Sequence, residues 1–179
     1  MMANASLNLI GIRTRIYKLK RSHLYIKSLI RRKNMKLSDR KYKQSVREKE
    51  NLVEILKSLH PRTNPGSYVF TSVDKPGPQL LGSAVMTFKE KEGTTIILRR
   101  EDAIRLQAAY AFESAWITLD VFSSLEAVGL TATISNLLCE NNIPCNIVSA
   151  RYHDHLFVPW EKRELTIILL KELANTYTN

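Results

Sequence analysis

Short runs of alternating apolar and polar residues predict strands in the second half of the chain. Residues 116–121 place Ile117, Leu119 and Val121 on one face of a strand and the intervening residues on the other. The next apolar positions recur every three or four residues, which is typical of a helix with one buried side. They are Ala127, Leu130, Ile134, Leu137 and Leu138. The pattern predicts a strand followed by an amphipathic helix.

The rest of this half predicts a hairpin and a closing helix. Residues 143–150 form a strand, residues 152–155 the tip of a hairpin, and residues 156–158 its return strand. Apolar residues at helical spacing then predict a helix over residues 161–174. The second half therefore has the order strand, helix, strand, strand, helix.

The first half has a similar but weaker pattern. A helix over residues 45–59 is expected to stop before Pro61, because proline disfavours helical geometry in the residue before it. The triplet Asn64-Pro65-Gly66 predicts a turn. The other expected elements are a strand over 68–73, a Pro- and Gly-rich loop over 74–82, a hairpin of strands 84–89 and 94–99, and a helix over 101–109. Together the two halves predict an α+β fold, with helices on one face of an antiparallel sheet.

Net charge divides the chain into a basic leader and a nearly neutral body. Residues 1–43 hold thirteen Lys or Arg and one acid, for a net charge of +12, whereas residues 44–179 carry −2. The body therefore lacks the basic patch expected of a nucleic-acid-binding domain. Its two cysteines form no disulfide framework and fit a reducing compartment. No apolar run is long enough for a transmembrane helix.

The leader has an apolar stripe at helical spacing among basic residues. The stripe consists of Ile12, Ile16, Leu19, His23, Ile26 and Ile30, and no acid precedes Asp39. A mitochondrial transit peptide, here residues 1–34, requires these features, and so does a basic helix on an anionic membrane. An unstructured extension, or a native start at Met35, also explains the segment. The expected location is cytoplasmic, or mitochondrial if the leader is a transit peptide.

Specific sequence patterns in the body resemble a known family. The segment from Val121 to Trp160, VFSSLEAVGLTATISNLLCENNIPCNIVSARYHDHLFVPW, resembles an ACT domain. From about Asn51 onward the chain is similar to small tandem-ACT proteins of uncharacterised function, through PRTNPGSYVFTSV, SSLEAVGLTA and YHDHLFV. The C-terminal unit resembles that of arginine sensors of the CASTOR kind. The resemblance implies two ferredoxin-like βαββαβ-type units, placed here at residues 44–112 and 113–179, packed side by side or as a dimer.

The same resemblance implies amino-acid-sized ligands bound between the units, and the residues suggest a site at the turn between strand and helix. Gly129 lets a ligand approach the backbone closely because it has no Cβ. Unpaired N–H groups at the start of the helix suit a carboxylate, and Asn146 offers a side-chain amide. The candidate ligand-binding residues are Ser123, Ser124, Val128, Gly129, Leu130, Asn146 and Ile147.

Two alternatives accompany this site. The sequence Ser-Ser-Leu-Glu at 123–126 could be a capping box that starts the helix at Ser123, which would leave Gly129 inside it. We instead expect residues 123–128 to form a loop and the helix to begin near Gly129, because this explains the glycine. Gly129 could also serve only tight helix–sheet packing, with the serines acting as caps.

Catalytic and metal-binding patterns are weak. His153 and His155 alternate along the chain and could share a metal ion, but no further ligand is spaced to complete the set, so a polar hairpin tip is the favoured interpretation. Neither cysteine has a catalytically spaced histidine, and no nucleophile, zinc or phosphate-binding motif occurs. We therefore expect no enzyme, cofactor or metal. The favoured function is a stand-alone regulatory sensor that binds an amino acid and acts on a partner protein or as a homodimer. A ligand-free dimerisation or adaptor module is the alternative.

Overall fold

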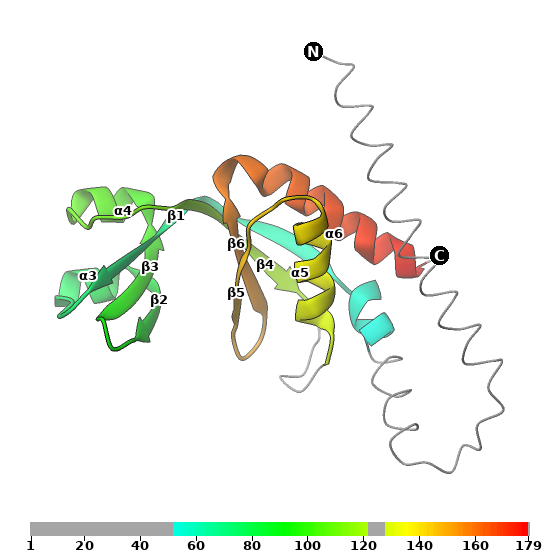
Figure 1. The fold of residues 1–179 in the computed structure, drawn as a ribbon, viewed down its shortest axis with the longest axis horizontal. Helices are drawn as coiled ribbons and strands as arrows, with labels where there is room; N and C mark the ends of the chain where they lie inside the picture. The colour runs from blue at the N-terminus through cyan, green and yellow to red at the C-terminus, as the bar shows by residue number, and fades with distance from the viewer. Residues whose placement is uncertain (1–51, 122–127, 179) are drawn as a thin grey trace, which may run out of the picture.

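The fold is α+β, with one antiparallel sheet and helices on one of its faces (Figure 1). The computed structural model describes residues 52–121 and 128–178. Residues 52–57 are helical and precede the elements labelled in Figure 1. These are β1 (His60–Val73), α3 (Pro78–Gly82), β2 (Ala84–Lys89), β3 (Thr94–Arg99), α4 (Arg100–Arg105), β4 (Glu113–Asp120), α5 (Leu130–Glu140), β5 (Asn146–Ser149), β6 (Asp154–Pro159), the 3-10 helix η1 (Trp160–Lys162) and α6 (Arg163–Thr178).

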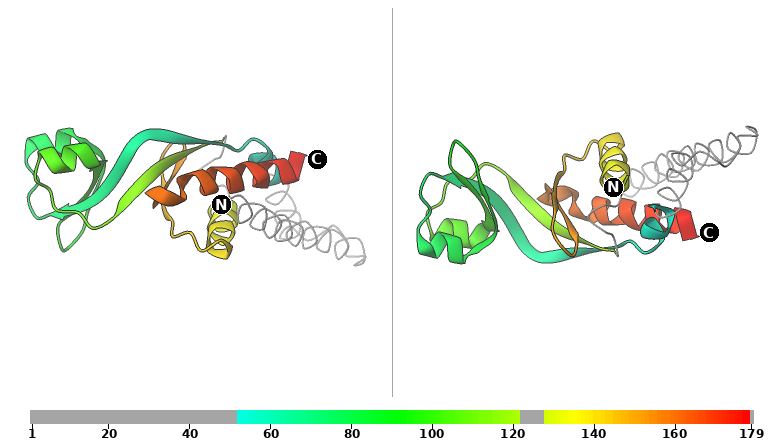
Figure 2. Two further views of the ribbon diagram at one scale, coloured as in Figure 1. Left: turned by 90° about the horizontal axis from the view of Figure 1, so that it is seen from above. Right: turned by 90° about the horizontal axis from the view of Figure 1, so that it is seen from below.

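The sheet joins two lobes, and its strands follow the order β2-β3-β1-β4-β6-β5. Lobe 1 comprises residues 67–112, and lobe 2 comprises residues 52–63, 113–121 and 128–178. The short helices α3 and α4 lie at one end of the molecule, and α6 runs along lobe 2 at the other end (Figure 2). The sheet crosses from one lobe to the other through β1 and β4.

The two lobes share strands β1 and β4. Residues 68–73 of β1 pair with β3 in lobe 1, whereas residues 60–63 pair with β4 in lobe 2. In turn, residues 113–115 at the start of β4 pair with residues 67–69 of β1. Lobe 1 therefore has the strand order β2-β3-β1-β4, and lobe 2 the order β1-β4-β6-β5. This is the expected ferredoxin-like arrangement, built twice. The division at residue 113, which stays a prediction, falls at the first residue of this shared strand.

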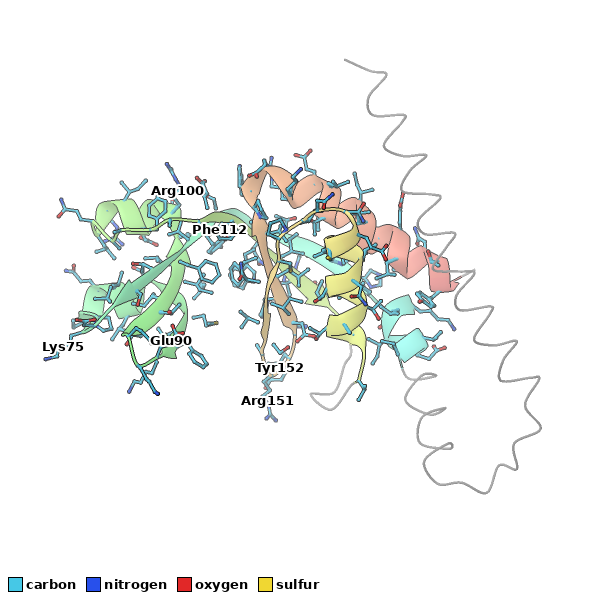
Figure 3. All side chains as sticks on the ribbon, viewed as in Figure 1. Lys75, Glu90, Arg100, Phe112, Arg151 and Tyr152 are labelled. Carbon is cyan, nitrogen blue, oxygen red and sulfur yellow. The ribbon has the colours of Figure 1, made fainter. Side chains whose placement is uncertain are left out.

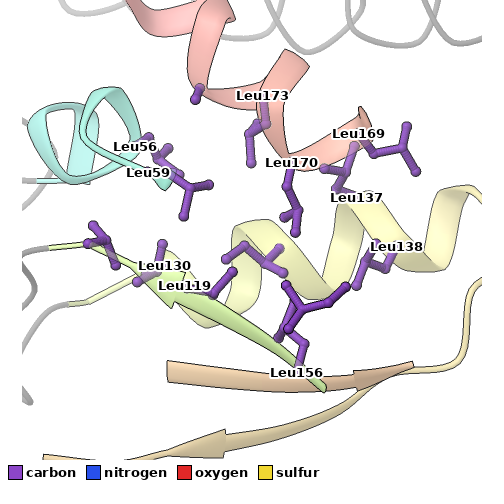
Figure 4. Close-up of a cluster of buried hydrophobic side chains, with 14 of the residues drawn as sticks. Leu56, Leu59, Leu119, Leu130, Leu137, Leu138, Leu156, Leu169, Leu170 and Leu173 are labelled. Carbon is purple, nitrogen blue, oxygen red and sulfur yellow. The ribbon is translucent and has the colours of Figure 1, made fainter. Parts of the chain in front are cut away.

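The helix-covered face carries the main hydrophobic core. Alternate residues of β4 and β6, such as Ile117 and Leu156, are fully buried against α5 and α6. The leucines of these helices and of residues 56–59 fill the same cluster (Figure 4). Lobe 1 has a much smaller core, made of Val69, Ile96, Leu98 and Ala103. Most of the burial that stabilises the fold therefore lies in lobe 2.

The opposite face of the sheet, here called the open face, carries aromatic side chains that join the lobes. Tyr68, Ile97 and Phe157 are buried, and Phe70, Met86, Trp116 and Val148 pack against them. The ring centroids of Phe70 and Phe157 lie 5.4 Å apart, and those of Tyr68 and Trp116 lie 5.1 Å apart, with both pairs edge to face. This geometry is favourable for aromatic rings. We call these seven residues the open-face cluster.

Several predicted elements are confirmed. The strands 84–89 and 94–99 have the predicted bounds, and Ile117, Leu119 and Val121 share the buried face of β4 and its end. The chain leaves its helical segment before Pro61, as expected. The closing helix begins as η1 and runs on to Thr178, beyond the predicted end at residue 174.

Two predictions in the first half are wrong. Asn64-Pro65-Gly66 is not a turn between elements but an irregularity within the long strand β1, where the register with β4 shifts between Thr63 and Ser67. Pro and Gly are tolerated at such bulges. The loop predicted over 74–82 contains helix α3, which begins with Pro78 at its first turn, where the missing N–H is not needed.

Asn64 replaces the backbone pairing that the bulge removes. Its side-chain Nδ2 donates to the Trp116 carbonyl at 3.2 Å and to Thr118 Oγ1 at 2.8 Å. The Tyr68 hydroxyl donates to the Pro65 carbonyl at 3.1 Å, on the other side of the same bulge. Side chains therefore hold β1 to β4 at the point where the lobes meet.

We expect the two lobes to unfold together because they share strands. Leu98→Ala removes a fully buried side chain from the lobe 1 core. The free energy of unfolding should fall by about 2–5 kcal/mol. Both tryptophans of the chain lie in lobe 2, so their fluorescence should show the same lowered denaturant midpoint as circular dichroism of the whole chain.

Ile104→Ala, at an exposed site in the same lobe, is the matched control and should change stability by less than about 0.5 kcal/mol. Separate midpoints for fluorescence and circular dichroism in Leu98→Ala would show that the lobes unfold independently.

Candidate functional site

Gly129 forms the turn into α5 and is needed there for its backbone conformation. Its φ is +103° and its ψ is −15°, a conformation that L side chains rarely adopt. Helix α5 starts at Leu130, and the N–H of Thr133 donates to the Gly129 carbonyl at 2.9 Å. The expectation that the helix begins near Gly129 is confirmed. Residue 128 is not helical, so α5 does not extend back to Ser123, which itself lies outside the described residues.

Packing also favours a glycine at this turn. A Cβ at position 129 would lie 2.9 Å from Cδ2 of Leu52, which belongs to the helical segment 52–57. Leu52 in turn packs against the main core. This contact supports the alternative that Gly129 allows close packing, and it places the segment 52–57 directly beside the turn.

The first turn of α5 presents N–H groups that no side chain of the described residues is seen to cap. Gly129 occupies the N-cap position and no acidic residue lies in the first turn. The N–H groups of Leu130, Thr131 and Ala132 precede the first intrahelical bond, so they have no acceptor within the helix. Leu130 is buried while Val128 is 63% exposed, so the core anchors the turn on one side and solvent reaches it on the other. The helix dipole makes this end electropositive.

The remaining candidate residues lie elsewhere. Asn146 pairs with Phe157, and Phe157 pairs with Trp116, so Asn146 lies on the open face at the level of Trp116. Trp116 is four residues before the end of β4, where the turn into α5 begins. That is about 13 Å along the strand. Ile147 lies on the opposite face and packs against the main core. Ser123 and Ser124 lie outside the described residues. Among the candidates, the structure therefore brings together Val128, Gly129 and Leu130.

A polar network on the open face of lobe 2 was not anticipated from the sequence. The indole Nε1 of Trp116 donates to Nδ1 of His155 at 3.0 Å, and Thr118 Oγ1 lies 3.2 Å from the same nitrogen. Burial lowers the pKa of His155, and the neighbouring His153 lowers it further. Strand alternation did place Trp116 and Thr118 on one face, but their contact with His155 could be known only from the sheet register.

Charged groups extend this network to the edge of the sheet. Arg62 Nε donates to Asp120 Oδ2 at 3.2 Å, and its Nη1 donates to Asn64 Oδ1 at 3.0 Å. The Nδ1 atom of His153 lies 3.9 Å from Asp120 Oδ1. The exposed Arg151 and Tyr152 form the tip of the β5–β6 hairpin beyond it (Figure 3). The charges of Arg62 and Asp120 are thus largely neutralised by each other.

No cluster of three or more metal-binding side chains occurs within residues 52–121 and 128–178. Both cysteines are free; Cys139 is exposed, whereas Cys145 packs against the main core. Burial raises the pKa of the Cys145 thiol to about 11, which keeps it protonated and unreactive at neutral pH. None of the described helices is long and apolar enough to cross a membrane.

Comparisons with known proteins agree with the fold. Residues 48–115 and residues 111–172 each match a family model described as an ACT domain. A protein of unknown function from Vibrio cholerae, described as a possible transport protein, is 36% identical with a TM-score of 0.65, over 71% of this chain and 98% of that one. A protein from Agobacterium tumefaciens shares the fold at 19% identity and a TM-score of 0.53, over 65% of this chain and 89% of that one. No curated protein matches the chain significantly.

The Gly129 turn can be tested by substitution. Gly129→Ala should lower the free energy of unfolding by about 1–2 kcal/mol, because alanine is strained at this φ. Part of the loss should come from the contact with Leu52. Chemical denaturation of Gly129→Ala in the wild-type and Leu52→Ala backgrounds should therefore give a smaller loss in the second. Equal losses would show that Leu52 does not restrict the turn.

Proposed function

The chain belongs to the ACT-domain family in its tandem form, and from this premise we propose that it is a stand-alone regulatory protein that binds an amino acid at the turn from β4 into α5. ACT domains are regulatory rather than catalytic modules. The observation that carries the proposal is the uncapped, electropositive first turn of α5. Regulation would be exerted on a separate partner protein.

The proposed ligand contact is between a carboxylate and the backbone N–H groups of the first helical turn. Those of Leu130, Thr131 and Ala132 lack an intrahelical acceptor, and a helix N-terminus favours a negative charge. Gly129 leaves the backbone uncovered by a Cβ. Ser123 and Ser124 are proposed to add hydroxyl contacts from the preceding loop. Asn146 and Ile147 lie on β5, which β6 separates from β4, so they would contribute only if the ligand extended across β6.

A route for signalling follows from the contact between Leu52 and Gly129. A ligand that changes the backbone of the turn also changes the surface on which Leu52 rests. Leu52 begins the described part of the helical segment 52–57, whose residues Ile55 and Leu56 enter the main core. We propose that ligand binding is transmitted to a partner through this segment.

A thermal-shift scan of the full chain against the twenty amino acids tests the proposal. A ligand selective for the native state stabilises it by RT ln(1 + [L]/Kd). Thr131→Glu, at an exposed position of the first turn, supplies a competing carboxylate. It should stabilise the unliganded protein by about 0.3–1 kcal/mol and abolish the shift produced by the amino acid. Thr131→Gln, of the same size without the charge, should retain that shift.

The amide derivative of the same amino acid provides a second control, because it lacks the carboxylate. It should bind neither the wild type nor Thr131→Gln. The proposal fails if no amino acid stabilises the folded protein at millimolar concentration, or if Thr131→Glu responds as strongly as Thr131→Gln.

A ligand-free dimerisation or adaptor module is the second candidate, and the open face favours it. A solvated sheet face is usually polar, yet on this one Phe88 is 60% exposed. Four members of the open-face cluster are only partly buried beside it, namely Phe70, Met86, Trp116 and Val148. Exposed apolar patches on soluble proteins often mark interaction sites.

Light scattering coupled to size exclusion distinguishes this candidate. If the open face mediates self-association, the full chain should be a dimer at about 100 μM, and Phe88→Asp should yield a monomer. Ile104→Asp, at a similarly exposed residue of α4 in the same lobe, should remain a dimer. A monomeric wild type at that concentration would contradict the dimer.

A further inference from the structure

His155 lies on the open face and is hydrogen-bonded directly to Trp116, one of the aromatic residues that join the lobes. Its Nδ1 accepts from the Trp116 indole N–H at 3.0 Å. Because an indole nitrogen can only donate, Nδ1 carries no proton, and the ring is neutral with its proton on Nε2. The fold therefore selects one protonation state of this side chain.

A proton on Nδ1 reverses the role of that nitrogen. The imidazolium then presents an N–H to the Trp116 N–H, and two donors cannot bond to each other. Thr118 Oγ1 lies 3.2 Å from the same Nδ1 and can accept from it. This hydroxyl already accepts from Asn64 Nδ2 at 2.8 Å, and its second lone pair remains for the imidazolium. Protonation thus moves the hydrogen bond of His155 from Trp116 to Thr118.

Trp116 connects this exchange to the junction of the lobes. Its ring stacks on Phe157 with centroids 6.2 Å apart and meets Tyr68 edge to face at 5.1 Å. Phe157 in turn contacts Phe70 of lobe 1 at 5.4 Å. Tyr68 donates its hydroxyl proton to the Pro65 carbonyl in the β1 bulge. Releasing the indole therefore loosens the aromatic contacts that hold the lobes at the bulge.

We propose that His155 is a proton switch for the junction between the lobes, in which uptake of a proton releases the Trp116 indole and loosens the β1 bulge. The switch does not depend on amino-acid binding at the Gly129 turn.

The surroundings of the ring set the range in which the switch acts. Burial lowers the pKa of His155 most; His153 on the hairpin and Arg62 on β1 also lower it, whereas Asp154 on β6 and Asp120 on β4 raise it. The net direction is below the ordinary value of 6.5. Since the unfolded chain then binds more protons than the folded one, stability is fully present above pH 6.5 and decreases as the pH falls toward the folded-state pKa.

Trp116 fluorescence tests the switch directly. Trp160→Phe leaves Trp116 as the single tryptophan in the full chain. Titration from about pH 8 to about pH 5 should change its emission with a midpoint below 6.5, while far-UV circular dichroism stays constant. In this background His155→Gln, which keeps an acceptor but does not titrate, should lose the transition. His153→Gln should retain it with a higher midpoint, because a neighbour that lowers the pKa of His155 has been removed.

Hydrogen exchange supplies the readout for the junction. The protection factors of the amides of residues 64 and 66–70, which correct for the pH dependence of intrinsic exchange, should fall below the midpoint in the wild type and stay constant in His155→Gln. Should His155→Gln fail to fold, proton NMR of the His155 ring in the wild type gives its pKa for comparison with the exchange midpoint. The switch is overturned if Trp116 emission is flat across the range, if it changes equally in His155→Gln, or if exchange at residues 64–70 does not follow it.

Discussion

Backbone pairing between β1 and β4 runs from His60 opposite Asp120 to Val69 opposite Glu113, and both lobes are built on it. Without β4, lobe 1 would lack a paired neighbour on one side of β1. Without residues 60–63, the first strand of lobe 2 would lose its partner on one edge. This mutual completion lets lobe 1, whose own core is small, persist beside a lobe that buries most of the apolar surface.

The two faces of the shared sheet have different tasks. The helix-covered face supplies burial, whereas the open face fixes how the lobes meet, through aromatic rings and the polar side chains around Trp116. The Gly129 turn lies at the border of the first region, where α5 meets Leu52. The bulge and His155 belong to the second. A ligand at the turn and a proton on the open face would thus act on different sides of one sheet.

Much of this fold could be predicted from the sequence, because short-range residue patterns determine where strands, turns and helices begin and end. The turn residues 90–93, which end in a glycine, located the hairpin 84–89 and 94–99 to the residue. The need to explain one glycine located the start of α5. The same local logic failed at Asn64-Pro65-Gly66, where pairing with β4, some fifty residues away in sequence, keeps the chain extended. The network around His155 could not be foreseen, since Arg62, Thr118 and His155 meet only through strand register. The resemblance to a family indicated the position of the turn, but not that Leu52 rests against it.

The strand shared between the lobes also matters while the chain is being synthesised. Residues 60–63 leave the ribosome first, but their partners at 117–120 follow more than fifty residues later, which corresponds to several seconds at about 5–20 residues per second. During that interval the nascent chain carries a strand half with no neighbour, which is a template for pairing with another chain. Its sequence, His-Pro-Arg-Thr, contains a proline that cannot donate and a cation that disfavours stacking against a copy of itself. Residues 60–63 thus carry features that protect them against aggregation until their partners in β4 have been synthesised.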